Sequence, residues 1–301
     1  MTAAALALAL GSAVLHAGWN TLVADARDTH ATTAVALLAG VLVLAPFAAA
    51  SWRVQAGVAP YAAASIALEL GYFALLATAY AGADLTTVYP VARGAAPVIA
   101  LVVSVTLLAA PVHPPQAAGV LAVGAGVLLV RGRRPDANVV RSHAGSHASR
   151  DAGSDDRPDC GGGSAASGLP LALAIAACIA GYTLVDDRGV RHAAALPYFE
   201  IVLGIAAVAY LAAVLAWRGG AAVRAAVGVR SVLAGAGMAV AYALVLFALE
   251  RAEAAPVAAI RETSVVMATV AVAVLGREHV SRARIAGAAV VVAGVAAIAL
   301  G

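Results

Sequence analysis

Ten long apolar stretches, each of about 20 residues, constrain the fold of this 301-residue chain more than any other feature. Hydrophobic residues make up 63% of the chain and mean hydropathy is +0.93, so a water-soluble fold would leave much apolar surface exposed. About 20 apolar residues in a helix span the ~30 Å hydrocarbon core of a bilayer. The sequence therefore predicts a membrane protein with spans near Ala3–Val23, Ala31–Ala50, Val58–Tyr80, Leu85–Ala109, Pro115–Val130, Gly168–Asp186, Leu196–Trp217, Ser231–Leu249, Ala254–Gly276 and Val280–Leu300.

The pattern inside these stretches favours helices. Transmembrane β-barrels show an alternation of apolar and polar residues, which these stretches lack. A helix also satisfies its backbone hydrogen bonds within one segment, as the hydrocarbon region requires. The predicted fold class is an all-α membrane protein with ten transmembrane helices.

A polar segment, residues 132–167, separates the fifth apolar stretch from the sixth. It is rich in Gly, Ser, Asp and Arg, and we expect a disordered linker there. His143 and His147 are spaced as metal ligands can be, but no second pair of ligands lies nearby, which favours a solvated linker. The predicted units are therefore residues 1–131 and residues 168–301, joined by this linker.

The sequences of the two units are similar to each other at an offset of 168 residues. The alignment pairs Arg93 with Arg261, Gly119 with Gly287 and Gly126 with Gly294. Each unit holds five predicted helices, and an odd number makes the second unit insert upside down relative to the first. The sequence thus predicts two inverted five-helix repeats that meet around a central cavity, with the glycine pairs allowing close helix packing.

Three motifs resemble the EamA-type carriers of the drug/metabolite transporter superfamily. They are His16-Ala17-Gly18-Trp19-Asn20, the stretch Tyr89-Pro90-Val91-Ala92-Arg93-Gly94-Ala95-Ala96-Pro97, and Arg261-Glu262-Thr263-Ser264 with the later Leu275-Gly276-Arg277-Glu278. The first unit departs from the family at Ala109-Ala110-Pro111, where a Gly-Glu-type pair is typical. The resemblance implies two five-helix repeats and the export or uptake of small metabolites.

Ionisable residues inside the apolar stretches are the candidates for function, because a charge at mid-bilayer costs at least ~2.5 kcal/mol unless it is paired or hydrated. Glu69 lies near the centre of its stretch, and we expect it to pair with Arg93 in the next one. Such a pair either joins two helices or makes Glu69 a site for a coupling proton. A buried carboxylate near a cation can bind and release a proton at physiological pH. Glu262 is the corresponding acid of the second unit.

Arg93 and Arg261 are predicted to hold an anionic group of the substrate, because a guanidinium contacts carboxylates and phosphates through two parallel hydrogen bonds. Snorkelling of either side chain to the membrane surface is the alternative. For His16 the alternative is a structural hydrogen bond, and Tyr198 and Glu200 fit the membrane interface better than the cavity. The predicted substrate-binding set is His16, Trp19, Asn20, Tyr72, Tyr89, Arg93, Tyr182, Thr183, Tyr242, Arg261 and Thr263.

These features predict a secondary transporter in the plasma or inner membrane that exports a small amino-acid-like, drug-like or anionic metabolite, with proton coupling as an option. A flippase for a lipid-linked sugar or phosphate is the alternative. An intramembrane enzyme is the third choice and the least favoured, because neither His-Glu-x-x-His nor Gly-x-Ser-x-Gly occurs. No cofactor or metal is expected. The isoelectric point of about 9.1 indicates contact with lipid headgroups rather than nucleic acid, and a homodimer is a candidate assembly.

The distribution of arginine predicts the orientation, since the chain has no lysine. Most arginines lie on the side of the linker, and the other side receives Arg53, Arg188, Arg191 and Arg251. This count places the linker in the cytoplasm and both termini outside. The family resemblance implies the reverse, so the sequence leaves the orientation open.

Overall fold

The computed structural model describes residues 1–301 except 25, 83–84, 112, 131–163, 268–281 and 301. The described residues are almost entirely helical, and their one isolated β-bridge joins Val54 to Ala193. This confirms the all-α prediction. In chain order the elements are α1 (Ala3–Ala24), α2 (Thr29–Ala50), the 3-10 helix η1 (Ala56–Val58), α3 (Ala59–Gly82), α4 (Leu85–Thr106), α5 (Pro114–Val130), α7 (Ser164–Gly189), α8 (Ala195–Ala226), α9 (Val229–Leu249), α10 (Ala254–Arg261) and α12 (Arg282–Leu300).

Six of the described helices are long and apolar enough to cross a bilayer. Their spans are Ala3–Asn20, Thr29–Ala50, Ala56–Leu76, Gly168–Gly189, Ala195–Ala226 and Val229–Leu249. Three shorter apolar segments accompany them in the described chain, at Val91–Thr106, Pro114–Leu129 and Ile285–Leu300. Six of the ten predicted stretches thus appear as clear spans and three as shorter apolar helices, and the stretch Ala254–Gly276 is described only in part.

One predicted helix is interrupted. The expected span Ala254–Gly276 breaks after Arg261, where α10 ends, and the chain is helical again over residues 263–267. The Thr263 hydroxyl donates to the carbonyl of Ile260 at 2.7 Å, which occupies an acceptor that a continuing helix would use. Residues of the expected span beyond 267 lie outside the described part.

Other helix ends differ from the predicted boundaries by a few residues. Helix α8 continues to Ala226 rather than ending near Trp217, with a sharp turn at Gly219, whose φ of 80° suits a residue without a Cβ. Helix α7 starts at Ser164, four residues before the predicted start at Gly168. Helix α4 ends at Thr106, and Ala109 beyond it has a φ of 46°.

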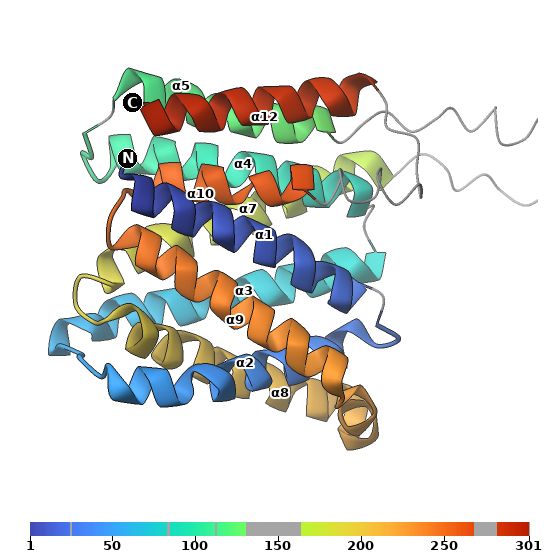
Figure 1. Ribbon diagram of the computed structural model, residues 1–301. Coiled ribbons are helices and arrows are strands. Elements are labelled where there is room, and N and C mark those ends of the chain that lie inside the picture. Colours follow the sequence, from blue (N-terminus) through green and yellow to red (C-terminus); the bar gives the residue numbers. More distant parts are fainter. Residues whose placement is uncertain (25, 83–84, 112, 131–163, 268–281, 301) are drawn as a thin grey trace, which may run out of the picture.

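The helices run along one common direction and form a bundle (Figure 1). Helices α5 and α12 pack together at one side, and α2 and α8 pack together at the opposite side. Between them, α1 packs against α9 and α3 against α7, while α4 contacts both α7 and α10. Both chain termini lie at the same end of the bundle. We call this the termini end, and the other, where α5 finishes and α7 begins, the linker end.

The aligned glycines lie where α5 meets α12. A Cβ atom added to Gly119 would lie 2.5 Å from the carbonyl oxygen of Gly294, and one added to Gly126 would lie 2.8 Å from that of Gly287. The backbones are therefore too close for any side chain at these positions. The glycines serve helix packing, as predicted. The contacts are crossed relative to the sequence alignment: Gly119 faces Gly294, the glycine aligned with Gly126, and Gly126 faces Gly287, the glycine aligned with Gly119.

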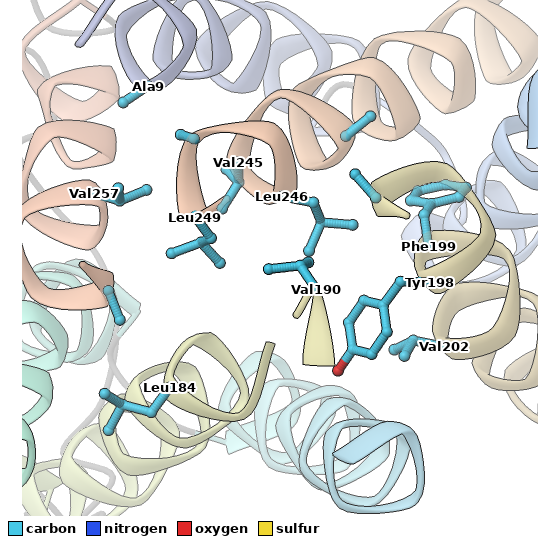
Figure 2. Close-up of a cluster of buried hydrophobic side chains, with 14 of the residues drawn as sticks. Ala9, Leu184, Val190, Tyr198, Phe199, Val202, Val245, Leu246, Leu249 and Val257 are labelled. Carbon is cyan, nitrogen blue, oxygen red and sulfur yellow. The ribbon is translucent and has the colours of Figure 1, made fainter. Parts of the chain in front are cut away.

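A cluster of buried apolar side chains fills the bundle near the termini end. Figure 2 shows Leu246 and Leu249 of α9, Val190 after α7, and Tyr198 and Val202 of α8 grouped around one region of this core. Tyr198 and Leu246 are 0% exposed. The termini end is thus packed, whereas a cavity occupies the middle of the bundle.

Candidate functional site

A cavity of about 150 Å³ lies between the helices in the middle of the bundle. Nine residues from the predicted substrate-binding and proton-coupling sets line it: His16, Trp19, Asn20, Glu69, Tyr72, Arg93, Tyr182, Tyr242 and Arg261. They come from α1, α3, α4, α7, α9 and α10, so residues far apart in the sequence share one space. Most of the remaining wall is apolar or aromatic, including Phe73, Phe199 and Tyr210.

The cavity reaches toward the linker end. On α2 its wall begins with the first helical residue, Thr29, and stops at Gly40 near the middle of the helix. On α1 it runs from Ser12 to Val23, one residue before the helix ends. Because α1 ends and α2 begins at the linker end, the space extends from the middle of the bundle to that end.

Arg93 is buried and has an acidic partner. Its Nη1 donates to Oε1 of Glu262 at 3.1 Å in an ion pair, and its Nη2 contacts Nε2 of His16. Glu262 lies directly after α10, at the break in the predicted helix. The charge of Arg93 is therefore balanced within the protein, by a residue of the other unit.

Arg261 has a different environment. It is 7% exposed, and its Nη2 donates to the hydroxyl of Tyr182 at 3.1 Å. Its Nε is buried and has no hydrogen-bond partner among the described residues, and no ion pair of Arg261 is formed there. The neutral phenol leaves the positive charge uncompensated by direct contact, on a side chain that lines the cavity.

The α1 motif forms one wall of the cavity. The His16 and Trp19 rings meet edge to face with 5.0 Å between their centroids, and Nδ2 of Asn20 donates to the His16 carbonyl at 2.7 Å. Nε1 of Trp19 is buried without a hydrogen-bond partner in the described part of the chain. Across the cavity, Tyr72 and Tyr182 meet edge to face at 6.4 Å.

Helix α7 repeats one hydrogen bond of α1 at the aligned position. Thr183 aligns with Asn20, and its hydroxyl donates to the carbonyl of Ile179 at 2.7 Å, four residues earlier, as Asn20 does to that of His16. Thr183 is buried and is absent from the cavity wall that the described residues form. The same holds for Thr263, whose hydroxyl bonds to Ile260, and for Glu262, which faces Arg93. The side chain of Tyr89 lies outside the described residues.

The expected Glu69–Arg93 ion pair is not formed in the described structure. Arg93 pairs with Glu262, because the break after Arg261 turns the Glu262 carboxylate toward α4. Glu69 is buried and lines the cavity on its own helix, α3. The carboxylate that the sequence suggested for Arg93 is thus not its ion-pair partner in the described structure.

A buried carboxylate that sequence reasoning did not select lies beside the cavity. Asp186 of α7 is 0% exposed and accepts hydrogen bonds from Ser65, Tyr198 and Tyr242. Tyr198, expected at the membrane interface, is fully buried in this cluster. An aspartate within an apolar stretch was the available signal, but it lay at the edge of the predicted span.

At the linker end the cavity wall includes a second polar pair. Nδ1 of His30 and the hydroxyl of Tyr210 lie 3.0 Å apart, and the His30 ring meets Trp217 edge to face. Sequence reasoning did not select these residues, since neither belongs to a repeated motif. In the described residues, no group of three or more His, Cys, Asp or Glu side chains is arranged to hold a metal ion.

Comparison with known proteins supports the resemblance. Residues 166–300 match the sequence model of the EamA-like transporter family. No curated protein is significantly similar in sequence to this chain. A solved structure described only as "Crystal structure of protein" is similar in fold, with a TM-score of 0.73 and 19% identity over 100% of this chain and 98% of the other. At that identity the likeness concerns the fold alone.

The family match covers the unit that holds Arg261, Tyr182 and Asp186. Members of this family are transporters, and the apolar helices of the chain fit a protein that crosses the membrane several times. The helical bundle, its central cavity and this match agree with one another. The second unit of the chain, over residues 166–300, is therefore similar in sequence to the EamA-like transporter family.

Proposed function

We propose that this chain is a secondary transporter of the plasma or inner membrane that exports a small metabolite with an anionic group. The observation that carries the proposal is Arg261, a buried guanidinium on the cavity wall with an unpartnered Nε and only a neutral hydrogen-bond partner in the described structure. A buried charge without a carboxylate in direct contact is costly, so a bound anion would stabilise it. A carboxylate or phosphate matches the guanidinium geometry.

The rest of the wall supports a substrate that is partly apolar. Trp19 contributes a second buried donor without a partner in the described residues, and the rings of Tyr72, Phe73 and Phe199 surround the space. Apolar and aromatic walls with a few polar groups are typical of sites for small organic molecules. A compact organic anion, including an amino-acid-like one, fits this combination.

We propose further that ten helices form two inverted five-helix repeats around this cavity. Four packing relations support this: α1 against α9 is matched by α7 against α3, while α5–α12 and α2–α8 each pair a helix with its own counterpart. The crossed glycine contacts between α5 and α12 fit the same twofold relation. Inverted repeats provide alternating access by letting one unit rock against the other.

Glu69 is the proposed site of a coupling proton, because it is a buried carboxylate that lines the cavity together with Arg261. The arginine count favours a cytoplasmic linker end, and that orientation would open the cavity to cytoplasmic substrate. Reporter fusions at Gly301, one active outside and one fluorescent inside the cell, test that orientation.

The first experiment compares metabolites inside and outside cells that make wild-type protein, Arg261→Met or Arg251→Met at equal membrane levels. Arg251 is a matched control, since it is exposed and pairs with Glu250. We expect the wild type and Arg251→Met to deplete the same anionic solute from cells, and Arg261→Met to leave it in place. A wild-type profile identical to that of empty cells would contradict the proposal.

A further inference from the structure

Asp186 lies at the floor of the cavity, between the space and the packed termini end. We propose that Asp186 is a positioning residue of the transport cycle: its hydrogen bonds hold the termini end closed, and Tyr242 links that closure to the cavity. This inference rests on the proposed transport function, since a closed end has a role only if the cavity opens alternately to both sides.

The bonds of Asp186 join four helices. Ser65 of α3 donates to Oδ1 at 2.6 Å, Tyr198 of α8 donates to Oδ1 at 2.9 Å, and Tyr242 of α9 donates to Oδ2. Asp186 itself belongs to α7. One carboxylate therefore ties a helix of the first unit to three helices of the second, which a closed state requires and an open state cannot keep.

The carboxylate of Asp186 suits this position better than an amide would. Three hydroxyl donors converge on two oxygens, and an amide in place of the carboxylate would offer a single acceptor oxygen. In the described residues Asp186 forms no ion pair, whereas its neighbour Asp187 pairs with both Arg188 and Arg191. The hydroxyl bonds are thus what stabilises the buried Asp186 charge, and separation of the helices would remove them together.

Two contacts connect this cluster to the cavity. Tyr242 lines the cavity while its hydroxyl bonds to Asp186, and its ring packs against Phe199 with 5.8 Å between centroids. Ser65 lies one helical turn before Glu69, so the two share a face of α3. Glu69, like Tyr242, lines the cavity. A bound substrate that shifts Tyr242 would therefore change the hydrogen bonds of Asp186.

Beyond Asp186, two loops from different units meet at the termini end. Main-chain bonds run from Gln55 N to His192 O at 2.8 Å and from Ala194 N to Arg53 O at 2.9 Å, and the β-bridge joins Val54 to Ala193. The Tyr61 and His192 rings stack at 5.2 Å. The first loop connects α2 to α3, and the second follows the end of α7, one helical turn after Asp186. Opening of this end has to separate these loops.

The test measures the fraction of molecules in which the two loops are in contact. A cysteine pair is placed at the bridge with Val54→Cys and Ala193→Cys, in a background of Cys160→Ala and Cys178→Ala. The rate of disulfide formation on mild oxidation in lipid vesicles then reports the closed fraction. We expect Asp186→Asn to lower the closed-to-open ratio about tenfold, as loss of a charge-assisted hydrogen bond predicts, and so to slow disulfide formation. Asp187→Asn, the matched control, should match the parent.

Tyr242→Phe and Ser65→Ala each remove one donor and keep the carboxylate, and we expect intermediate rates. These two variants also test the proposal if Asp186→Asn fails to fold, which size-exclusion chromatography would show. Equal rates for the parent, Tyr242→Phe and Asp186→Asn would overturn the proposal.

The same cysteine pair separates this inference from the proposed function. We expect the oxidised pair to abolish export of the solute found in the metabolite comparison, and a reductant to restore it. Export that continues with the disulfide formed would overturn the closure role and leave transport standing. If wild-type protein exports nothing, the proposed function fails, while the effect of Asp186→Asn on disulfide formation still decides whether Asp186 holds the loops together.

Discussion

Arg93 of α4 and Glu262, the residue after α10, form a buried ion pair with 3.1 Å between Nη1 and Oε1. The pair joins the two units of the chain through residues 169 positions apart. It also distinguishes the two aligned arginines, because Arg93 has an acidic partner and Arg261 has a phenol. The first predictions concern this difference.

Replacement of Glu262 by Gln should destabilise the fold strongly, because it leaves the Arg93 guanidinium buried without its counterion. We expect a loss of about 3–5 kcal/mol of unfolding free energy, measured by denaturant unfolding in detergent micelles. Glu250→Gln is the control: its pair with Arg251 is partly exposed, and such pairs contribute at most about 1 kcal/mol. Similar losses for both variants would show that the buried pair has no special role.

Replacement of both partners should cost less than replacement of one. Arg93→Met with Glu262→Met removes both charges, so neither member of the pair is left buried without the other. We expect the double variant to recover most of the stability that Glu262→Gln loses, in the same unfolding measurement. A loss equal to the sum of the single variants would mean that the two side chains act independently.

Replacement of Arg261 by Lys should weaken substrate binding while leaving the fold intact, because lysine keeps the charge but cannot form two parallel hydrogen bonds. For the solute identified in the metabolite comparison, we expect the half-saturation concentration of export to rise about tenfold or more. Tyr182→Phe, which removes the hydroxyl bonded to Arg261, should have a smaller effect in the same direction. An unchanged half-saturation value for Arg261→Lys would place the anion elsewhere.

Replacement of Glu69 by Gln tests proton coupling. The change keeps the size of a buried cavity residue and removes its ability to bind and release a proton. In proteoliposomes, we expect a pH gradient to drive solute accumulation by the wild type and not by Glu69→Gln, while exchange without a gradient continues. Accumulation by both proteins would exclude Glu69 as the coupling residue.

Gly235 should tolerate no side chain. A Cβ at this position of α9 would lie 2.2 Å from the carbonyl oxygen of Ala36 on α2, so α9 would have to move. We expect Gly235→Ala to lower the unfolding free energy by about 2 kcal/mol. Gly204→Ala in α8 is the control, since the nearest atom there is 3.9 Å away and alanine favours a helix. Comparable thermal stability of the two variants would contradict the tight contact between α2 and α9.

Much of the cavity wall was predictable because its residues interrupt apolar segments or repeat between the units. Arg93, Arg261, Glu69 and the Trp19 motif are all costly or unusual in hydrocarbon, and all are on the cavity wall. Residues without such a signal were missed. His30 lies at the start of α2, where polar side chains are common, and Tyr210 is a single tyrosine in the middle of α8; only the approach of α2 to α8 brings them together.

The partners of the buried charges were not predictable. Glu69 precedes Arg93 by 24 positions, which made it the natural candidate, but the break at Glu262 presents another acid. In the sequence Asp186 is the last residue of a predicted span. In the structure α3, α8 and α9 each provide a hydroxyl group that donates a hydrogen bond to it. In each case the outcome depends on helices that are distant in sequence.

The sequence by itself determined that this chain is an all-helical membrane protein whose second unit resembles the EamA-like transporters, because apolar length, the absence of alternation and the spacing of a few motifs are local properties of the chain. Only the tertiary structure decided which charge neutralises Arg93, which arginine keeps an unpartnered nitrogen at the cavity, and which end of the bundle is packed. The physical reason is that a buried charge is stabilised by atoms within about 3 Å of it, and the packing of the helices selects those atoms.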